Sequence, residues 1–325
     1  MTKQIAIGYH GHCFDGMASA ALLTRLLRHQ LGGEPKFRYF GLDHQPGGSH
    51  VPEKCLDGEL NAVVDFRYST SDKLHWWFDH HLTGLVGAAE HEHFARDRSG
   101  TKFYDPHYGS CTKLIADTAR EHFGLDLSAA SELIHWAHVI DTAGFPDAET
   151  AVALSAPALQ LMTVIESHGN DAFIVPRIER LAAGEPLQVI AEDPAVEALF
   201  KPLRARHQQN CEVIKERAVL RDGVVFFDLS GVGDDRYNKF IPYWLFPESR
   251  YCVAVTVGPA RAKVSVGSNP WSPVPRTHDI SAICARFGGG GHAVVGAVSL
   301  AASEVDKARS IAGDIVSELT LRSVE

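Results

Sequence analysis

Two apolar runs of this sequence lead directly into side chains that can bind a divalent cation. The segment Val63–Asp65 reads V-V-D, and the segment Trp76–His81 reads W-W-F-D-H-H. Both runs have the composition of buried strands, and ligand sites in an open parallel sheet form at the C-terminal ends of its strands. Carboxylate oxygen and neutral imidazole together suit Mn²⁺ or Mg²⁺, or Zn²⁺ where nitrogen dominates. Taken alone, the second segment is equally compatible with a surface loop that carries two solvated histidines.

A further group of potential ligands lies between a short apolar strand and a densely apolar helix that begins at Met17. His10, His12, Cys13 and Asp15 occur there within six residues, more than a simple connection needs. A strand, a polar loop with glycine and a buried helix form the usual opening of an α/β sheet. The structural alternative makes Asp15 the N-cap of the helix.

Asp141 ends another apolar helix, predicted over residues 127–142. The helix dipole disfavours a carboxylate at that end, and a nearby cation would remove the penalty. A solvated acid at a frayed helix end is the alternative. His135 and His138 lie three apart on this helix, a spacing that can chelate, but its apolar character favours core histidines.

Four consecutive glycines, Gly288, Gly289, Gly290 and Gly291, precede His292 between an apolar helix and a strand. Such a run is costly in chain entropy. It is explained where the backbone approaches a ligand closely and presents N–H groups to an anion. We favour this interpretation over a flexible loop, because a linker seldom runs from a helix directly into a histidine and a strand.

The elements that would position these residues form two parts, and the predicted fold class is α/β. A mainly parallel sheet flanked by helices is predicted for a domain of residues 1–194, and a smaller α/β domain for residues 195–325, with a charged helix after residue 194 linking them. In order, we predict strands at 4–9, 36–40 and up to Asp65 and Asp79, loops at 41–52 and 82–110, a helix at 111–123 capped by Ser110, helices up to 193 with a break at 184–186, and strands at 224–229, 251–257, 262–266 and 293–300.

Composition limits the class of protein. The 325 residues carry a net charge of -9, which argues against an overall basic surface for long nucleic acid. The six cysteines are scattered without a C-x-x-C pair, as in a reduced cytoplasmic protein. We expect neither a signal peptide nor a membrane span, and the sequence leaves a homodimer open.

Together these motifs resemble the DHH phosphoesterase superfamily. H-x-x-C-x-D-G at His10–Gly16, V-D at Val64-Asp65, D-H-H at Asp79–His81, D-T-A-G-F at Asp141–Phe145 and G-G-G-G-H at Gly288–His292 occur in the family's order and span almost the whole chain. The glycine-rich segment resembles the C-terminal domain associated with DHH domains. The resemblance implies a two-metal hydrolase with an active site in the cleft between the two domains.

The resemblance also implies a role for each motif residue. Asp65 would bridge two ions, His10 would bind the first, and Asp15, His80 and Asp141 would bind the second. Asp79 would orient its neighbours, His81 would face the substrate phosphate, and residues 288–292 would hold the other end of the substrate. Two Mn²⁺ ions are the expected cofactor, with Mg²⁺, Zn²⁺ or Fe as alternatives.

Two positions depart from the family pattern. Cys13 stands where a ligand of the first metal is usually aspartate; a thiolate would favour Zn²⁺ or Fe, a neutral thiol would leave fewer ligands, and His12 is a substitute. Gly267 stands where many members carry arginine, which leaves Arg261, Lys263 and Asn269 as candidates for substrate contacts.

The resulting expectation is a cytoplasmic hydrolase of phosphate ester bonds, acting on a small phosphorylated substrate such as a short oligonucleotide or a nucleotide bisphosphate. Activated water would attack the phosphorus in line, without a covalent enzyme intermediate. The alternatives are hydrolysis of inorganic pyrophosphate or polyphosphate, and a non-catalytic nucleotide sensor with a degenerate first metal site.

Overall fold

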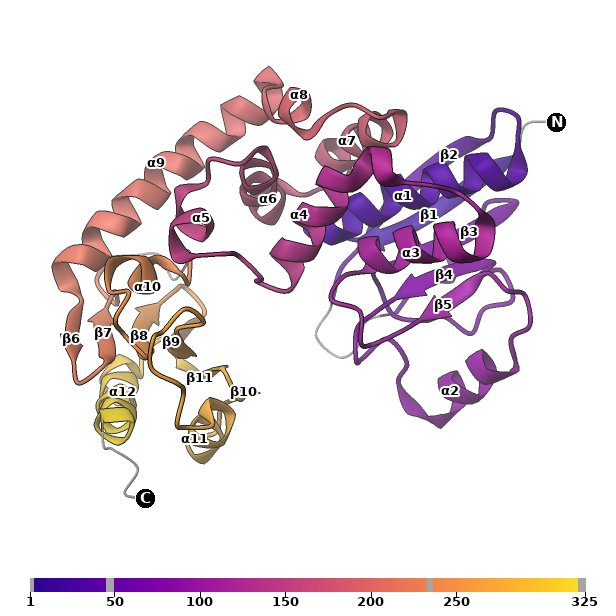
Figure 1. Cartoon of the computed structure of the whole chain (residues 1–325). Coiled ribbons are helices and arrows are strands. Elements are labelled where there is room, and N and C mark those ends of the chain that lie inside the picture. Colours follow the sequence, from indigo (N-terminus) through magenta and orange to yellow (C-terminus); the bar gives the residue numbers. More distant parts are fainter. Residues whose placement is uncertain (1–2, 45–49, 233–235, 321–325) are drawn as a thin grey trace. The chain divides into compact units, whose positions relative to one another are not determined.

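A computed structural model describes residues 3–44, 50–232 and 236–320 of the chain (Figure 1). The chain divides into two compact units, which are described separately. The first comprises Met1–Phe145 and Ser155–Leu203, and the second comprises Pro146–Leu154 and Arg204–Glu325. The predicted boundary near residue 195 falls at the start of helix α9 (Pro194–Arg217), which begins in one unit and ends in the other.

The described residues of the first unit form a five-stranded sheet in the order β2-β1-β3-β4-β5, and every neighbouring pair is parallel. Its elements are β1 (Gln4–His10), α1 (Phe14–Leu31), β2 (Lys36–Leu42), the 3₁₀ turn η1 (Glu53–Cys55), β3 (Leu60–Val64), β4 (Trp76–Asp79), α2 (Gly87–Arg96), β5 (Lys102–Tyr104), α3 (Cys111–Phe123), the 3₁₀ turn η2 (Ser128–Ala130), α4 (Ser131–Asp141), α6 (Pro157–His168), α7 (Asp171–Ala183) and α8 (Leu187–Ala191). The α/β class and the parallel sheet are as predicted.

Alternation along the strands gives this sheet two covered faces. On one face α1 packs under α3, α4 and α7 (Figure 1), and Tyr39 of β2 reaches Thr24 of α1 with a hydroxyl contact of 2.9 Å. The next residue, Phe40, points to the other face, where it joins a buried cluster with Trp77. Phe94 of α2 packs against that cluster. Apolar side chains therefore cover both faces of the sheet. Polar side chains of the strands that bind a ligand can gather only at the strand ends.

The second unit contains a mixed sheet in the order β10-β11-β9-β8-β7-β6, in which only β7 and β8 are parallel among the described strands. Its elements are α5 (Ala148–Ala153), the end of α9, β6 (Val219–Arg221), β7 (Val224–Asp228), α10 (Ile241–Leu245), β8 (Tyr251–Val257), β9 (Arg261–Ser268), α11 (Ile280–Arg286), β10 (Gly290–His292), β11 (Val295–Ala301) and α12 (Val305–Thr320). Helices α11 and α12 bury apolar side chains against one face of this sheet.

Three sequence-based predictions of local structure were wrong. Residues 82–110 contain helix α2 and strand β5, where a loop was expected. Helix α4 begins at Ser131, after a 3₁₀ turn, and not at residue 127. The glycine run is partly a strand, β10. The structural alternative for Asp15 is excluded, because the N-cap of α1 is Cys13 and Asp15 lies in the first turn of the helix. Part of the loop predicted at 41–52 lies outside the described residues.

Candidate metal centre

Three neighbouring parallel strands end at the same edge of the first sheet and carry the motif residues there. His10 is the last residue of β1, Asp65 directly follows β3, and Asp79 is the last residue of β4. Because the order is β1-β3-β4, these residues become neighbours in space. Two helices complete the group, with Asp15 in the first turn of α1 and Asp141 at the C-terminal end of α4.

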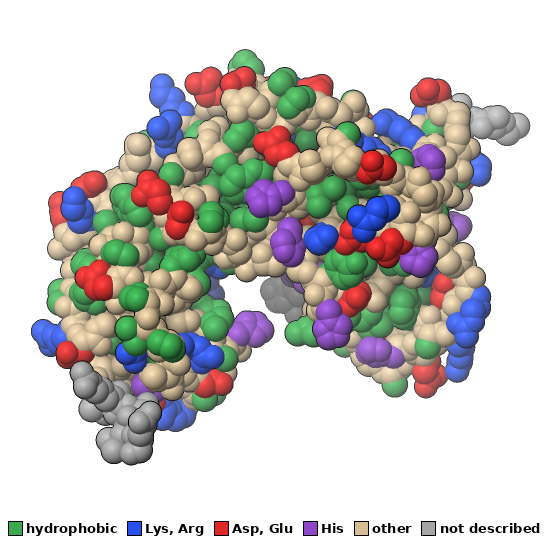
Figure 2. Space-filling model, viewed as in Figure 1, with side chains coloured by type: hydrophobic (Ala, Val, Ile, Leu, Met, Phe, Trp, Pro, Cys, Tyr) green, Lys and Arg blue, Asp and Glu red, His purple; other side chains and the backbone are tan. Residues whose placement is uncertain are grey.

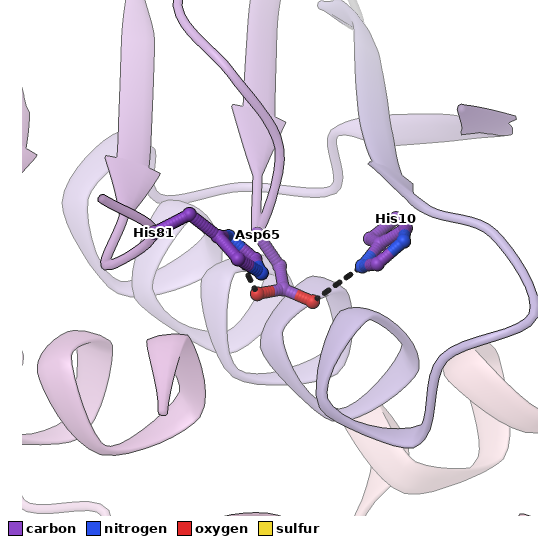
Figure 3. Close-up of side chains that lie close together, drawn as sticks. All are labelled: His10, Asp65 and His81. Atoms are coloured by element: carbon purple, nitrogen blue, oxygen red, sulfur yellow. Dashed lines mark ion pairs between the residues drawn. The ribbon is translucent and has the colours of Figure 1, made fainter. Parts of the chain in front are cut away.

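Asp65 lies at the centre of this edge. Its side chain is only 1% exposed, and its backbone has φ of 56°, a left-handed conformation that is uncommon outside glycine. One carboxylate oxygen, Oδ2, is 3.4 Å from Nδ1 of His10, while Oδ1 is 3.4 Å from Nε2 of His80 and 3.8 Å from Nδ1 of His81. The two oxygens therefore face different histidines, as a bridging carboxylate must (Figure 3).

Asp79 organises the two histidines that follow it. Its Oδ1 accepts hydrogen bonds from the backbone N–H groups of His80 (2.9 Å) and His81 (3.2 Å) and from Nδ1 of His81 (2.7 Å). Nδ1 of His80 is 3.0 Å from the carbonyl oxygen of Tyr108, which can only accept, so this nitrogen carries the proton. When His80 is neutral, its Nε2 carries the lone pair and points at the carboxylates, the arrangement in which ligating histidines are usually held.

The N-terminus of helix α3 fixes Asp15. Backbone N–H groups of Cys111 and Thr112 donate to its carboxylate at 2.7 and 3.1 Å, and Ser110 caps the same helix by accepting from the N–H of Lys113. The positive end of the helix dipole favours a carboxylate at this position. Asp15 is thus held in place from outside the group, with its Oδ2 3.9 Å from Nε2 of His80.

Crowding of buried carboxylates shifts the pKa of several groups. Burial and the neighbouring Asp65 and Asp141 raise the pKa of Asp15 well above its usual range, and burial and Asp65 raise the pKa of Asp141 to about 6. Burial opposes protonation of His80, but the surrounding carboxylates outweigh it and raise its pKa to about 9. Burial would also raise the pKa of Asp65, yet the neighbouring imidazoles of His10 and His80 lower it.

The donor atoms fit divalent cations. Ligand atoms of His10, Asp65 and His81 converge within 4.8 Å of one another, and so do those of Asp15, His80 and Asp141. Both oxygens of Asp65, Nδ1 of His10 and Nε2 of His80 are buried without a hydrogen-bond partner. Buried polar atoms left in this state are costly, and bound cations would satisfy all of them.

The residues that form the first set differ from the ligands expected for the first ion. His81, expected to face substrate, also lies close to His10 and Asp65, whereas Cys13 and His12 join neither set among the described residues. Burial, with Asp65 and Asp15 nearby, raises the pKa of the Cys13 thiol well above its usual value, so the thiol is neutral in the metal-free protein. His12 is exposed and its ring approaches Gly169: a Cβ placed there would be 3.1 Å from its Nδ1.

Sequence reasoning missed several groups that hold the site in place. These are the carbonyl of Tyr108, the two N–H groups at the start of α3, and His44, whose ring centroid lies 4.9 Å from that of His10. Backbone groups cannot be recognised from the residue types in a sequence. His44 could have been recognised, because it is a histidine that follows the end of β2 by two residues, at the same sheet edge.

The histidines of helix α4 do not form a core pair. His135 is exposed and His138 is half-buried, and both line a cavity of about 370 Å³ between α3 and α4 together with Lys113, Asp117 and Arg120. The expectation of core histidines was therefore wrong for His135. Asp117 pairs with Lys113 and Arg120, so the charges at the cavity wall largely cancel.

In the second unit, the fold itself requires three of the four consecutive glycines. Gly288 has φ of 77° and Gly291 has φ of 150°, and a Cβ at Gly289 would lie 2.2 Å from the carbonyl oxygen of Ala297. Gly290 differs: its φ is ordinary, and no described atom lies within 4 Å of the position of a Cβ. His292 is exposed at the end of β10.

Tyr243 occupies the space that a side chain at position 267 would need. A Cβ at Gly267 would lie 2.5 Å from the hydroxyl oxygen of Tyr243, so a larger residue would require that ring to shift. Of the substitutes suggested, Asn269 is buried and donates to the carbonyls of Pro247 and Ser249. Lys263 lies opposite Ser299 of β11, whereas His292 lies opposite Val295. These two positions of β11 are four residues apart, which is about 13 Å along the strand.

Comparisons agree with this description at the level of the fold. None of the protein-family models matches the sequence, and none of the curated proteins matches it. Among solved structures, the chain has the fold of DHH-domain proteins, which confirms the α/β architecture expected from the motifs.

Two of these structures are similar over nearly the whole chain. One is the pGpG-specific phosphodiesterase PggH from Vibrio cholerae, with 17% identity and a TM-score of 0.67, covering 97% of this chain and 99% of that one. The other is the DHH domain of a member of a family of ribosomal proteins, with 13% identity and a TM-score of 0.58, covering 98% of this chain and 87% of that one.

Proposed function

We propose that this protein is a metal-dependent phosphoesterase that hydrolyses a small phosphorylated substrate, such as a short oligonucleotide or a nucleotide bisphosphate. The observation that carries the proposal is the pair of neighbouring ligand sets: one contains buried Asp65, and His80 of the other lies 3.4 Å from an oxygen of Asp65. Two divalent ions bound there would supply hydroxide near neutral pH and neutralise phosphoryl oxygens. The fold relative from Vibrio cholerae is, by its name, specific for pGpG, which makes pGpG the first substrate to test.

The protein's own residues would divide the remaining work. Asp65 would hold both ions, with His10 at the first and with Asp15, His80 and Asp141 at the second. His81 is the most exposed of the three histidines at the strand ends, with 33% of its side chain accessible against 10% for His80. Its Nδ1–H is held by Asp79, which leaves Nε2 for the substrate phosphate.

His81 is also suited to donate a proton. Burial opposes its protonation, but Asp79 and Asp65 outweigh burial and raise its pKa. A protonated imidazole beside the scissile bond can hydrogen-bond the phosphoryl oxygen and can supply a proton to the leaving alkoxide. In the second unit, the N–H groups of Gly288 and Gly289 donate to the carbonyls of Ala285 and Cys284, so contacts with the other end of the substrate would come from the exposed backbone at Gly290 and Gly291 and from the side chain of His292.

The proposal is tested by incubating purified protein with pGpG, a 3′,5′-bisphosphate nucleotide and pyrophosphate, each with Mn²⁺ and with excess chelator. We expect Mn²⁺-dependent release of mononucleotide or phosphate from an ester substrate. Asp65→Asn should lower kcat by at least about 1,000-fold, because it removes the shared charge from both ions.

Each of the other outcomes has a definite meaning. Turnover of pyrophosphate alone would support an inorganic pyrophosphatase. Nucleotide binding with bound metal but without turnover would support a sensor, and would refute the phosphoesterase. The same activity in Asp65→Asn as in the unmodified protein would show that another site does the chemistry.

A further inference from the structure

The first ion of the proposed centre has only two protein ligands if His81 serves the substrate. His10 and Asp65 then remain to hold this ion, whereas catalytic zinc sites usually supply three protein ligands. The thiol of Cys13 does not join the set in the described residues. The second ion has four candidates, Asp15, Asp65, His80 and Asp141.

His44 lies beside the incomplete set. It follows β2, the strand next to β1, so it shares the sheet edge with His10 and Asp65. Its ring meets that of His10 edge-on at a centroid distance of 4.9 Å, and it stacks on Phe66 at 5.1 Å with an interplanar angle of 28°. Phe66 directly follows Asp65, so the residue that supports the His44 ring is fixed to the bridging carboxylate.

We propose that His44 is the third protein ligand of the first ion, and that it makes the two halves of the centre selective for different metals. This inference rests on the proposed function. The first site would then present two imidazoles and one carboxylate, a donor set that suits Zn²⁺ or Fe²⁺. The second site would present three carboxylates and one imidazole, which suits Mn²⁺ or Mg²⁺.

A change in the side-chain torsions of His44 would complete the site. The nitrogens of His44 lie outside the group whose ligand atoms converge within 4.8 Å, and the residue is exposed. A rotation of the imidazole over the Phe66 ring would bring a nitrogen toward His10. Phe66 limits the alternatives, because the stacked ring keeps the imidazole on the side of Asp65.

The experiment measures metal binding to the full-length protein. Chelator-stripped protein receives one equivalent of Zn²⁺ with a large excess of Mn²⁺, is desalted, and is analysed for both metals. Zn²⁺ affinity is then measured by competition with a chromophoric chelator for the unmodified protein, His44→Ala, His81→Ala and His91→Ala. His91 is an exposed histidine of helix α2 and is the matched control.

We expect one Zn²⁺ and one Mn²⁺ per chain in the unmodified protein. His44→Ala should weaken Zn²⁺ binding by about 10- to 100-fold or more, the loss seen even for residues that only orient ligands, and should alter the visible spectrum of Co²⁺ placed in the first site. Mn²⁺ binding at the second site should not change, and His91→Ala should match the unmodified protein.

Two results would overturn the assignment. If His81→Ala loses Zn²⁺ while His44→Ala retains it, His81 is the third ligand. If the unmodified protein takes up two Mn²⁺ ions in the presence of Zn²⁺, the two sites are not selective. Turnover is assayed separately: both ions bound without hydrolysis would refute the proposed function and leave the assignment of His44 standing.

Discussion

A bridging carboxylate must be fixed in position without using its oxygens for hydrogen bonds, and Asp65 meets this requirement. Its backbone N–H donates to the carbonyl of Phe78 at 2.9 Å, and its left-handed conformation turns the side chain away from the strand line and toward the edge. That conformation costs about 1 kcal/mol or more for a residue with a Cβ. Both side-chain oxygens remain available for cations.

In the proposed centre, Asp79 orients the ligating histidines and is not itself a ligand. We predict that Asp79→Ala lowers kcat and metal affinity by about 10- to 100-fold, as is typical when a group that orients ligands is lost. Asp79→Asn should recover part of the loss, because its amide oxygen still accepts from the N–H groups of His80 and His81. Steady-state kinetics and metal analysis of the two variants test this. Equal losses in both variants would mean that the charge of Asp79 matters and not its hydrogen bonds.

The raised pKa values predict how metal binding depends on pH. In the metal-free protein His80 has a pKa of about 9 and Asp141 of about 6, and both must lose their protons to bind an ion. At a pH below the unfolded-state pKa of each group, the bound proton contributes its full stabilisation to the metal-free fold. This contribution is lost as pH rises through about 6 for Asp141 and then through about 9 for His80.

Metal affinity should therefore rise between pH 6 and pH 9, with release of about one proton from His80 at pH 7. Calorimetric titration of the chelator-stripped protein in two buffers of different ionisation enthalpy measures that release. An affinity for Mn²⁺ that stays constant over this range would contradict the assignment of His80 as a ligand.

At the scale of elements, the sequence predicted those helices and strands whose positions depend on hydrophobic periodicity. The strands that end near Asp65 and Asp79, the cap at Ser110 and the helix end at Asp141 all occur as expected. Helix α2 was missed because its first turns are rich in histidine and glutamate, and Phe94 is its main apolar contact. Contacts between distant segments, such as α3 with Asp15, have no local signature.

Strand β10 allows the substrate role of the glycine run to be tested separately from its structural role. Gly290→Ala should fold normally, because a Cβ there meets no described atom within 4 Å, yet it should raise KM severalfold if substrate approaches this backbone. Gly291→Ala should instead destabilise the protein by about 1 to 3 kcal/mol, because its φ of 150° is nearly exclusive to glycine. Thermal unfolding and KM are the measurements. A wild-type KM in Gly290→Ala would remove substrate contact at this position.

At the scale of the whole molecule, the two units are joined by more than one connection. The chain enters the second unit after Phe145, returns at Ser155, and enters it again within helix α9. Residues 146–154 are held there by His207, whose Nε2 contacts the carbonyl of Val152 at 2.8 Å, and by Asn238, which donates to that of Ala151. A cut at residue 194 would therefore separate this segment from its partners. None of the helices in the described ranges has the length and apolar composition of a membrane span.

The charge of the whole chain predicts its preference for substrate length. The net charge is -9, and on the face shown in Figure 2 the described Lys and Arg side chains are scattered among Asp and Glu and do not form a stripe. Proteins that bind long nucleic acid neutralise many phosphates with such side chains, and their affinity falls steeply with salt. Here the metal ions would supply most of the positive charge, for one or two phosphates only.

We therefore predict that kcat/KM is highest for dinucleotides and falls for 5-mers and 20-mers of the same sequence type. For the dinucleotide, the slope of log KM against log salt concentration should be about 0.7 to 1.4, since each of one or two phosphate contacts contributes roughly 0.7 for a single strand. The measurement is a length series assayed from 50 to 300 mM KCl at fixed Mn²⁺, with Asp65→Asn as the blank. A preference for the 20-mer, or a slope near that of a protein with many phosphate contacts, would indicate an exonuclease that holds a long strand, and would contradict the small-substrate assignment while leaving the metal centre intact.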